Sequence, residues 1–306
     1  MKAGLGDAER RELSRLRWVI GTPYVVQGTS GLVEVPILFF IKFTLGMGDA
    51  GGQLFDSLRN VGWFVKPAWG FISDRVPLWG YRRKSWFVLM ACLAVVFWTL
   101  NGVLAHAGVR VPAVYLFTFN LAFATYAFVD VVCDAIMVTA GRRLQRVGSF
   151  VNFQWTLLAL SSAFAISLGG WLQSRVETGA LDPALIFLLA GIPPLVTAAV
   201  GLQYIDEVRT ARRRGPSEPA GPHAAQLRPV LVKIGRWLRS SPARFGSFRR
   251  ENRTLWLLML FIFFWRFSPS VGYIERSYLI DARDFTALSF GVILSVGSVV
   301  FLVSIF

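Results

Sequence analysis

The sequence reads Lys66-Pro-Ala-Trp-Gly-Phe-Ile-Ser-Asp-Arg-Val-Pro-Leu-Trp-Gly-Tyr-Arg-Arg-Lys84 between two long apolar runs. The first of these runs begins near Gln53, and the second starts at once with Ser85. The segment between them holds an acid, a Pro/Gly turn and a basic cluster, which are typical of a short loop on the cytoplasmic side of a membrane. The stretch therefore predicts two membrane helices joined by a charged hairpin (residues 74–84).

The composition favours a membrane protein over a soluble one. Of the 306 residues, 54% are hydrophobic and only 16% are charged, as a bundle of lipid-facing helices requires. The net charge of +14 would suit nucleic acid, but most basic residues lie in short gaps between apolar runs. Cys92 and Cys133 lie in separate runs without metal-ligand spacing. We therefore predict the lipid bilayer as the surroundings, with no nucleic-acid partner, no metal and no cofactor.

Eight apolar runs are long enough to cross a bilayer, which takes about 20 residues per helix. Backbone groups in lipid need hydrogen-bond partners within their own segment, so each run is expected to be helical. The runs cover residues 18–44, 53–73, 85–105, 112–139, 151–174, 183–205, 254–273 and 287–306.

Lysines and arginines are concentrated in alternate gaps. The N-terminal tail and the gaps after the second, fourth and sixth runs hold 24 of the 32 basic residues. The other gaps hold only Arg110, Arg175, Arg276 and Arg283. Because basic loops stay on the inner side, we predict a multi-pass protein of the cell membrane with its N-terminus in the cytoplasm.

The gap after the sixth run is long and divides the chain. Its first part, residues 212–222, is rich in Pro and Gly and is typical of a flexible linker. Apolar residues then share one helical face over residues 227–238, which predicts an interfacial amphipathic helix, with a basic solvated linker as the alternative. We divide the chain into a six-helix N-terminal transmembrane domain (1–206), a basic cytoplasmic linker (207–253) and an incomplete C-terminal transmembrane domain (254–306).

Six helices, a long basic linker and further helices form the layout of major facilitator transporters, whose two halves enclose a central site. Specific residues narrow the family further. They are Lys66-Pro67, Gly70, Ser73-Asp74, Pro77-Leu78 and Gly80 to Arg83 around the hairpin, Tyr24 to Gly28, Asp130 to Ala135, and Pro269-Ser270. With these residues the chain closely resembles the folate–biopterin transporter family over nearly its whole length.

The resemblance implies an all-α major facilitator-type bundle that moves folate, pterin or a related flat anionic metabolite by alternating access, driven by protons. It implies no enzyme activity. The alternative is a non-transporting membrane assembly factor or an inactive truncated fragment of such a carrier.

Two departures from the family stand out. Thr139 occupies the position at which the family usually has a glutamate. The chain also stops at Phe306, after the eighth run. We expect a truncated product or, as the second choice, a separate polypeptide that supplies the missing ninth to twelfth helices.

Charged residues inside the apolar runs are the first candidates for substrate binding, because each is costly in lipid unless it is paired or faces water. Asp56, Arg59 and Lys66 share one face of the second run. Asp130 and Asp134 share one face of the fourth, with Asp130 at a depth similar to that of Lys66. Lys66 and Asp130 are therefore predicted to pair, and the alternative is that this pair only locks the bundle.

A flat polar heterocycle needs aromatic faces and amide-like partners, and the carboxylates of a folate need arginine or lysine. Asp130 or Asp134 is the candidate proton carrier. Glu34 and Lys42 are further candidates, although the long side chain of Lys42 is expected to reach the membrane surface. The predicted substrate-binding residues are Gln27, Arg59, Lys66, Asp130, Asp134 and Arg266.

The hairpin is predicted to act as a gate. Asp74 can pair with the neighbouring arginines, while Pro77 and Gly80 keep the turn short. The alternative is that the arginines only fix the orientation in the membrane, which leaves Asp74, Pro77 and Gly80 unexplained. The predicted gating residues are Gly70, Asp74, Arg75, Gly80, Arg82 and Arg83.

Overall fold

The computed structural model describes residues 7–207 and 271–305, with five further positions between them. The chain separates into two compact units, one of Met1–Val208 with Val271–Phe306 and one of Arg209–Ser270. All helices named below belong to the first unit. The predicted interfacial helix and Arg266 lie outside the described residues. The predicted domain boundaries stay a prediction.

The predicted all-α membrane bundle is confirmed. The described residues are mostly helical and form no strand. Six helices within this part of the chain are long and apolar enough to cross a membrane. They are Arg10–Thr44, Arg83–His106, Pro112–Arg143, Val147–Glu177, Pro183–Tyr204 and Ala287–Ser304.

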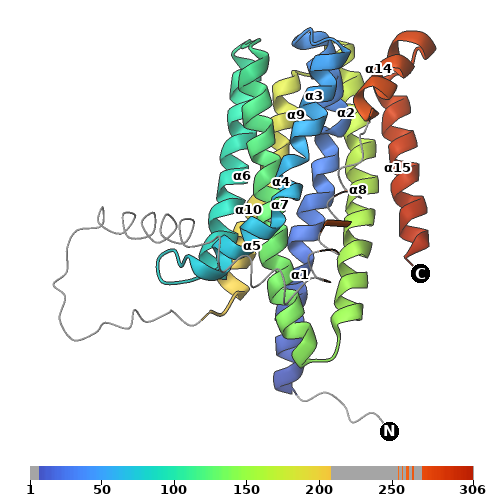
Figure 1. Cartoon of the computed structure of the whole chain (residues 1–306). Coiled ribbons are helices and arrows are strands. Elements are labelled where there is room, and N and C mark those ends of the chain that lie inside the picture. The colour runs from blue at the N-terminus through green and yellow to red at the C-terminus, as the bar shows by residue number, and fades with distance from the viewer. Residues whose placement is uncertain are drawn as a thin grey trace, which may run out of the picture. The chain divides into compact units, whose positions relative to one another are not determined.

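The first predicted run is helical throughout but changes its helix type along its length. It consists of α1 (Asp7–Thr29), the 3₁₀-helix η1 (Ser30–Val33), α2 (Glu34–Phe39) and the π-helix η2 (Phe40–Thr44) (Figure 1). Such irregular turns widen or tighten a helix locally, and π segments are frequent at functional sites.

The second predicted run is not one helix but three short ones: α3 (Asp49–Arg59), α4 (Val61–Phe64) and α5 (Lys66–Arg75). Pro67 explains the second break, because proline lacks the backbone N–H that would continue the hydrogen bonds of α4 and is tolerated in the first turn of α5. The indole of Trp69 donates to the carbonyl of Gly62 at 2.9 Å, which satisfies an acceptor at the break. The interruption places Lys66 at the first turn of a helix inside the bundle.

The remaining helices form the rest of the bundle. The core of the first unit is built around α7, whose apolar residues are buried along most of its length. The bounds are α6 (Arg83–His106), α7 (Pro112–Arg143), α8 (Val147–Glu177), α9 (Pro183–Ala190), α10 (Ile192–Tyr204), α14 (Gly272–Arg283) and α15 (Ala287–Ser304).

Two hydrophobic clusters hold these helices together. In the first, Phe119 of α7 packs edge-to-face against Phe187, with ring centroids 5.0 Å apart, and against Phe40. In the second, Cys133 is fully buried beside the first helix, and its thiol lies 3.6 Å from the carbonyl oxygen of Ile20. Cys133 is thus a small buried apolar side chain, whereas Cys92 is exposed.

Asp182 starts α9 by capping it. Its carboxylate accepts a hydrogen bond from the backbone N–H of Ala184 at 2.9 Å and lies 2.8 Å from Nδ1 of His106. The hydrogen bond with His106, followed by the one from Ala184, lowers the pKa of the Asp182 carboxyl below its ordinary value. The cap thereby ties the start of α9 to the end of α6.

The contact between α8 and α15 depends on two glycines. A Cβ atom added to Gly170 would lie 2.7 Å from the Cα of Gly291. Because the obstacle is backbone, Gly170→Leu is expected to push the helices apart and to lower the free energy of unfolding by about 1–3 kcal/mol. A lower thermal midpoint of the detergent-solubilised protein would show it. Gly297→Leu on α15 is the matched control, because Gly297 has open space around it; equal midpoints for both variants would contradict the prediction.

Candidate functional site

Lys66 and Asp130 form an ion pair inside the bundle. The Nζ of Lys66, at the start of α5, lies 2.5 Å from Oδ2 of Asp130 on α7. The Asp130 side chain is 6% exposed, whereas that of Lys66 is 37% exposed. Lys66 also lies 4.7 Å from the ring centroid of Trp63, at the distance of a cation–π contact. The predicted pairing is thus confirmed, while the role of the pair in binding stays a prediction.

Asp134 lies one helical turn beyond Asp130 and has a different partner. The hydroxyl of Tyr24, on α1, donates to Oδ1 of Asp134 at 3.0 Å. Residues four apart on a helix share a face, so the two carboxylates face α5 and α1 from the same side of α7. Three helices therefore converge on these acids.

Gln27 belongs to the same region. It lines a small cavity of about 10 Å³ together with Asp130, Tyr126 and Thr197. This volume is about what one water molecule needs. The Thr197 hydroxyl is buried and has no hydrogen-bond partner among the described residues. The mostly apolar lining of this cavity thus includes the polar side chains of Gln27 and Thr197 beside Asp130.

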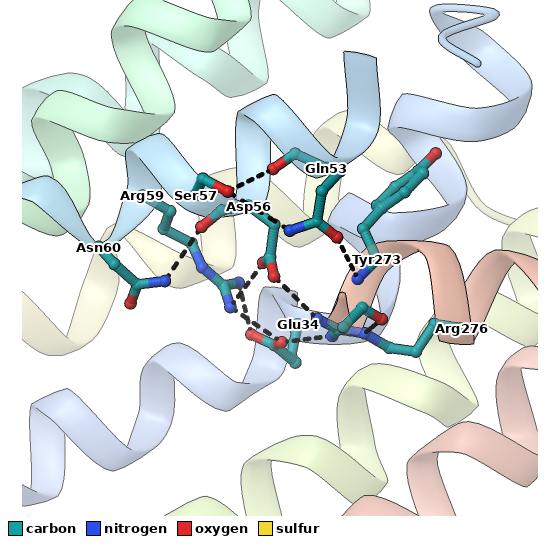
Figure 2. A network of polar contacts seen from close by, with 9 residues as sticks. Glu34, Gln53, Asp56, Ser57, Arg59, Asn60, Tyr273 and Arg276 are labelled. Atoms are coloured by element: carbon teal, nitrogen blue, oxygen red, sulfur yellow. Dashed lines mark hydrogen bonds and ion pairs between the residues drawn. The ribbon is translucent and has the colours of Figure 1, made fainter. Parts of the chain in front are cut away.

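Arg59 lies apart from this pair, in a network of two arginines and two carboxylates (Figure 2). Its guanidinium lies 2.7 Å from Glu34 and 3.1 Å from Asp56. Arg276 of α14 binds the same acids, at 2.7 Å to Glu34 and 3.4 Å to Asp56. All four side chains are between 13% and 22% exposed. Arg59 is thus occupied by carboxylates, and its predicted role in binding substrate stays a prediction.

Lys42 also binds α14, and its expected reach to the membrane surface stays a prediction. Its Nζ lies 2.8 Å from the Asp281 carboxylate and 2.7 Å from the hydroxyl of Ser277. Ser277 in turn donates to Asp49 of α3 at 2.6 Å. Lys42 thus has a carboxylate and a hydroxyl within reach at this end of the bundle, and the Asp281 side chain is itself 60% exposed.

Tyr273 completes the contact between α14 and α3. Its backbone N–H donates to Oε1 of Gln53 at 3.2 Å, as Figure 2 shows. A Cβ atom added to Gly52 would lie 2.0 Å from its ring, so the tyrosine fits only against a glycine. We call the contacts of α14 with α2, η2 and α3 the α14 seam.

The hairpin holds its predicted ion pair at the other end of α5. Nε of Arg83 lies 3.1 Å from Oδ1 of Asp74. The turn is closed by two backbone hydrogen bonds of 2.9 Å between Leu78 and Tyr81. Gly80 has a φ of 86°, a conformation that favours glycine and explains its place in the turn.

The other predicted gating residues lie nearby with different contacts. Arg75 lies over the ring of Phe71 at 4.0 Å, and Gly70 faces Val131 of α7. The backbone N–H of Arg82 donates to Glu207 at 2.9 Å, which fixes the hairpin to the segment after α10. Their gating role stays a prediction.

A cavity of about 590 Å³ opens at the hairpin end. The hairpin, α1, α7 and the segment after α10 surround it. Arg15 pairs with Asp206 on its wall, and Arg143 pairs with Glu12. The cavity thus has a charged rim whose basic and acidic groups largely balance.

Sequence reasoning found Lys66, Asp130 and Glu34 but missed Arg276. Arg276 was counted only as a loop charge, because it follows an apolar run. In the structure Arg276 lies on α14 (Gly272–Arg283), a helix that the apolar runs did not predict. No group of His, Cys, Asp and Glu suited to a metal ion occurs in the described part of the chain.

Comparison with known proteins gives a consistent result. The sequence pattern of the BT1 family matches residues 27–305. The protein named "Folate-biopterin transporter" from Synechocystis sp. is 30% identical over 271 residues, which cover 88% of this chain and 48% of that protein. "Probable folate-biopterin transporter 7" from Arabidopsis thaliana is 26% identical over 74% of this chain and 51% of its own length.

A more distant relative is "Folate transporter 1" from Plasmodium falciparum, 23% identical over 60% of this chain and 35% of its own length. The chain spans about half the length of the curated relatives it matches, or less. No solved structure matches it significantly.

Proposed function

Because the chain belongs to the BT1 family of folate–biopterin transporters, we propose that this multi-pass membrane protein carries folate, pterin or a related flat anionic metabolite across the membrane. The proposed partners are that small molecule and the lipid bilayer. The family is a transporter family, which argues against an enzyme.

The Lys66–Asp130 pair carries this proposal. Ionisable residues inside a membrane bundle are costly and usually mark a solute or ion path. Lys66 can bind a solute carboxylate, and Asp130 can accept hydrogen bonds from ring N–H groups. Gln27 beside Asp130 adds an amide, which suits the edge of a pterin. In this proposal the substrate enters between Lys66 and Asp130, and its own carboxylate and ring N–H groups replace the ion pair.

The two ends of the bundle support a rocking cycle. The α14 seam joins the helix after the long linker to the first two runs at one end. The hairpin end has the 590 Å³ cavity and the Asp74–Arg83 pair. We propose that the seam closes the outer end, that the hairpin gates the cytoplasmic end, and that the two open in alternation.

Proton coupling is proposed for Asp130 and Asp134. The two carboxylates lie one turn apart, and only Asp130 has a lysine partner, while Asp134 is bound by the Tyr24 hydroxyl. A solute that displaces Lys66 from Asp130 would leave two neighbouring carboxylates, which favours binding of a proton.

Reconstitution of the purified chain into liposomes tests the proposal. We expect labelled folate or biopterin to accumulate above the level of protein-free liposomes, and faster with an acidic exterior. Unlabelled biopterin should suppress this uptake. If correctly inserted protein moves neither compound at any pH gradient, the transport proposal is wrong and a non-transporting assembly role is favoured.

A further inference from the structure

A second cavity, of about 520 Å³, lies at the end of the bundle opposite the hairpin. It lies where η2, the end of α8, the start of α9 and the turn between α14 and α15 meet. This volume is within the range of small-molecule sites in proteins. Neither Lys66 nor Asp130 is among the described residues that line it.

The walls of this cavity are aromatic. Phe39, Phe40, Phe43 and Phe285 all line it. Phe40 is held in place by edge-to-face contacts, with its centroid 5.3 Å from that of Phe187. Phe43 is 62% exposed, so its ring is available for contact. A flat ring fits such walls by stacking.

The side-chain amide of Gln173 is a polar group on the cavity wall that could bind a ligand. This residue is only 6% exposed overall and lines the cavity, and its side-chain amide is not among the buried polar groups without a partner in the described part of the chain. An amide that lines a cavity can exchange hydrogen bonds with water for hydrogen bonds with a ligand. The amide is therefore ready for a partner that enters the cavity.

Carboxylates set the chemistry of that partner. Glu177 lies four residues after Gln173, hence on the same face of α8, and Asp284 lies across the cavity. Asp284 ends α14 with a left-handed backbone of φ 52°, which is common at helix C-termini and places its side chain on the cavity wall. No lysine or arginine is among the described lining residues, so the cavity favours N–H donors and disfavours carboxylates.

The π-helix η2 makes this arrangement possible. It places Phe40, Phe43 and Thr44 on the cavity wall. Its lysine, Lys42, is engaged by Asp281 and Ser277 and does not line the cavity. Helices of this type are frequent at functional sites.

We propose that this cavity is a second binding site, which holds the amino-substituted ring of a pterin between its phenylalanines. The amide of Gln173 pairs with the ring amide, the carboxylate of Glu177 accepts from the ring amino group, and any acidic tail stays outside. The choice of a pterin rests on the proposed function, whereas the preference for a flat ring with an N–H edge rests on the cavity alone.

The test uses pterin (2-amino-4-hydroxypteridine) and the Lys66→Ala/Asp130→Asn chain, so that neither charge of the central pair contributes. We expect saturable binding by equilibrium dialysis, weakened about tenfold by Gln173→Leu, as loss of one buried hydrogen bond predicts. Phe43→Ala, which leaves the buried core intact, should weaken binding at least about fivefold. Gln203→Leu on an exposed face of α10 is the matched control and should change nothing.

Lumazine, which has an oxo group in place of the 2-amino group, should bind about tenfold more weakly than pterin, because one donor to Glu177 is lost. No saturable binding of pterin, or equal affinity of the Gln173→Leu, Phe43→Ala and Gln203→Leu chains, would overturn the inference. Uptake by the unsubstituted chain is measured separately. Pterin binding without any uptake would refute the transport proposal and leave the second site standing.

Discussion

We expect Lys66→Ala to lower the initial rate of labelled folate uptake in proteoliposomes by about 100-fold, because the substitution breaks the ion pair with Asp130. The substitution leaves Asp130, which is 6% exposed, without its cation. Removing one partner of a buried pair costs about 3–5 kcal/mol, and it also removes the group proposed to bind the solute. Equal amounts of inserted protein must be compared, because part of this cost falls on stability.

The double variant Lys66→Ala/Asp130→Asn separates binding from packing. It removes both charges, so the burial penalty disappears. If the pair only locks the bundle, the double variant regains the stability and the uptake of the unsubstituted chain. We expect it to regain stability and to remain inactive. Wild-type uptake by either variant would refute the assignment of this pair to the solute path.

Glu34→Gln is expected to open the α14 seam, because Glu34 lies 2.7 Å from both Arg59 and Arg276, closer than Asp56 lies to either. The variant leaves Asp56 alone with two arginines, and the resulting repulsion is expected to weaken the contact of α14 with α3. A single cysteine at Asn60, which lies beside the network in Figure 2, reports the change in a chain lacking native cysteines. Its labelling by a membrane-impermeant maleimide should be about tenfold faster, the equivalent of about 1.4 kcal/mol.

Glu275→Gln is the matched control for this experiment. Glu275 lies on α14 next to Arg276, but its side chain is exposed and forms no ion pair with the described residues. Its substitution should leave the labelling rate unchanged. Equal rates for Glu34→Gln and Glu275→Gln would show that the network does not hold the outer end closed.

The sequence was sufficient to predict the helical membrane fold and the central ion pair. Lys66 and Asp130 could be matched because both interrupt apolar runs at similar depth. The acids and arginines of the seam could not be grouped in this way. Glu34 and Arg276 are 242 residues apart, and no periodicity within either segment indicates that they meet.

The interruptions of the second run were also difficult to predict. Pro67 indicates one break, but the other follows Arg59 at Asn60, where only packing against α7 gives a reason. Gly62 there lies so close to α7 that a Cβ atom would be 2.8 Å from the Cα of Ala124. Local propensity contains no information about such a close approach between helices.

The short helix α5 has a mechanical consequence. It begins at Lys66 and ends at Arg75, so it is a stiff rod of about 15 Å with Lys66 at one end and Asp74 in its last turn. The breaks at Asn60 and Val65 separate it from α3, which is bound into the seam. A solute that pulls Lys66 from Asp130 would therefore tilt the rod and shift Asp74 against Arg83. On the proposed function, we expect α5 to act as a lever that converts an exchange of charge partners inside the membrane into movement of a loop at its surface.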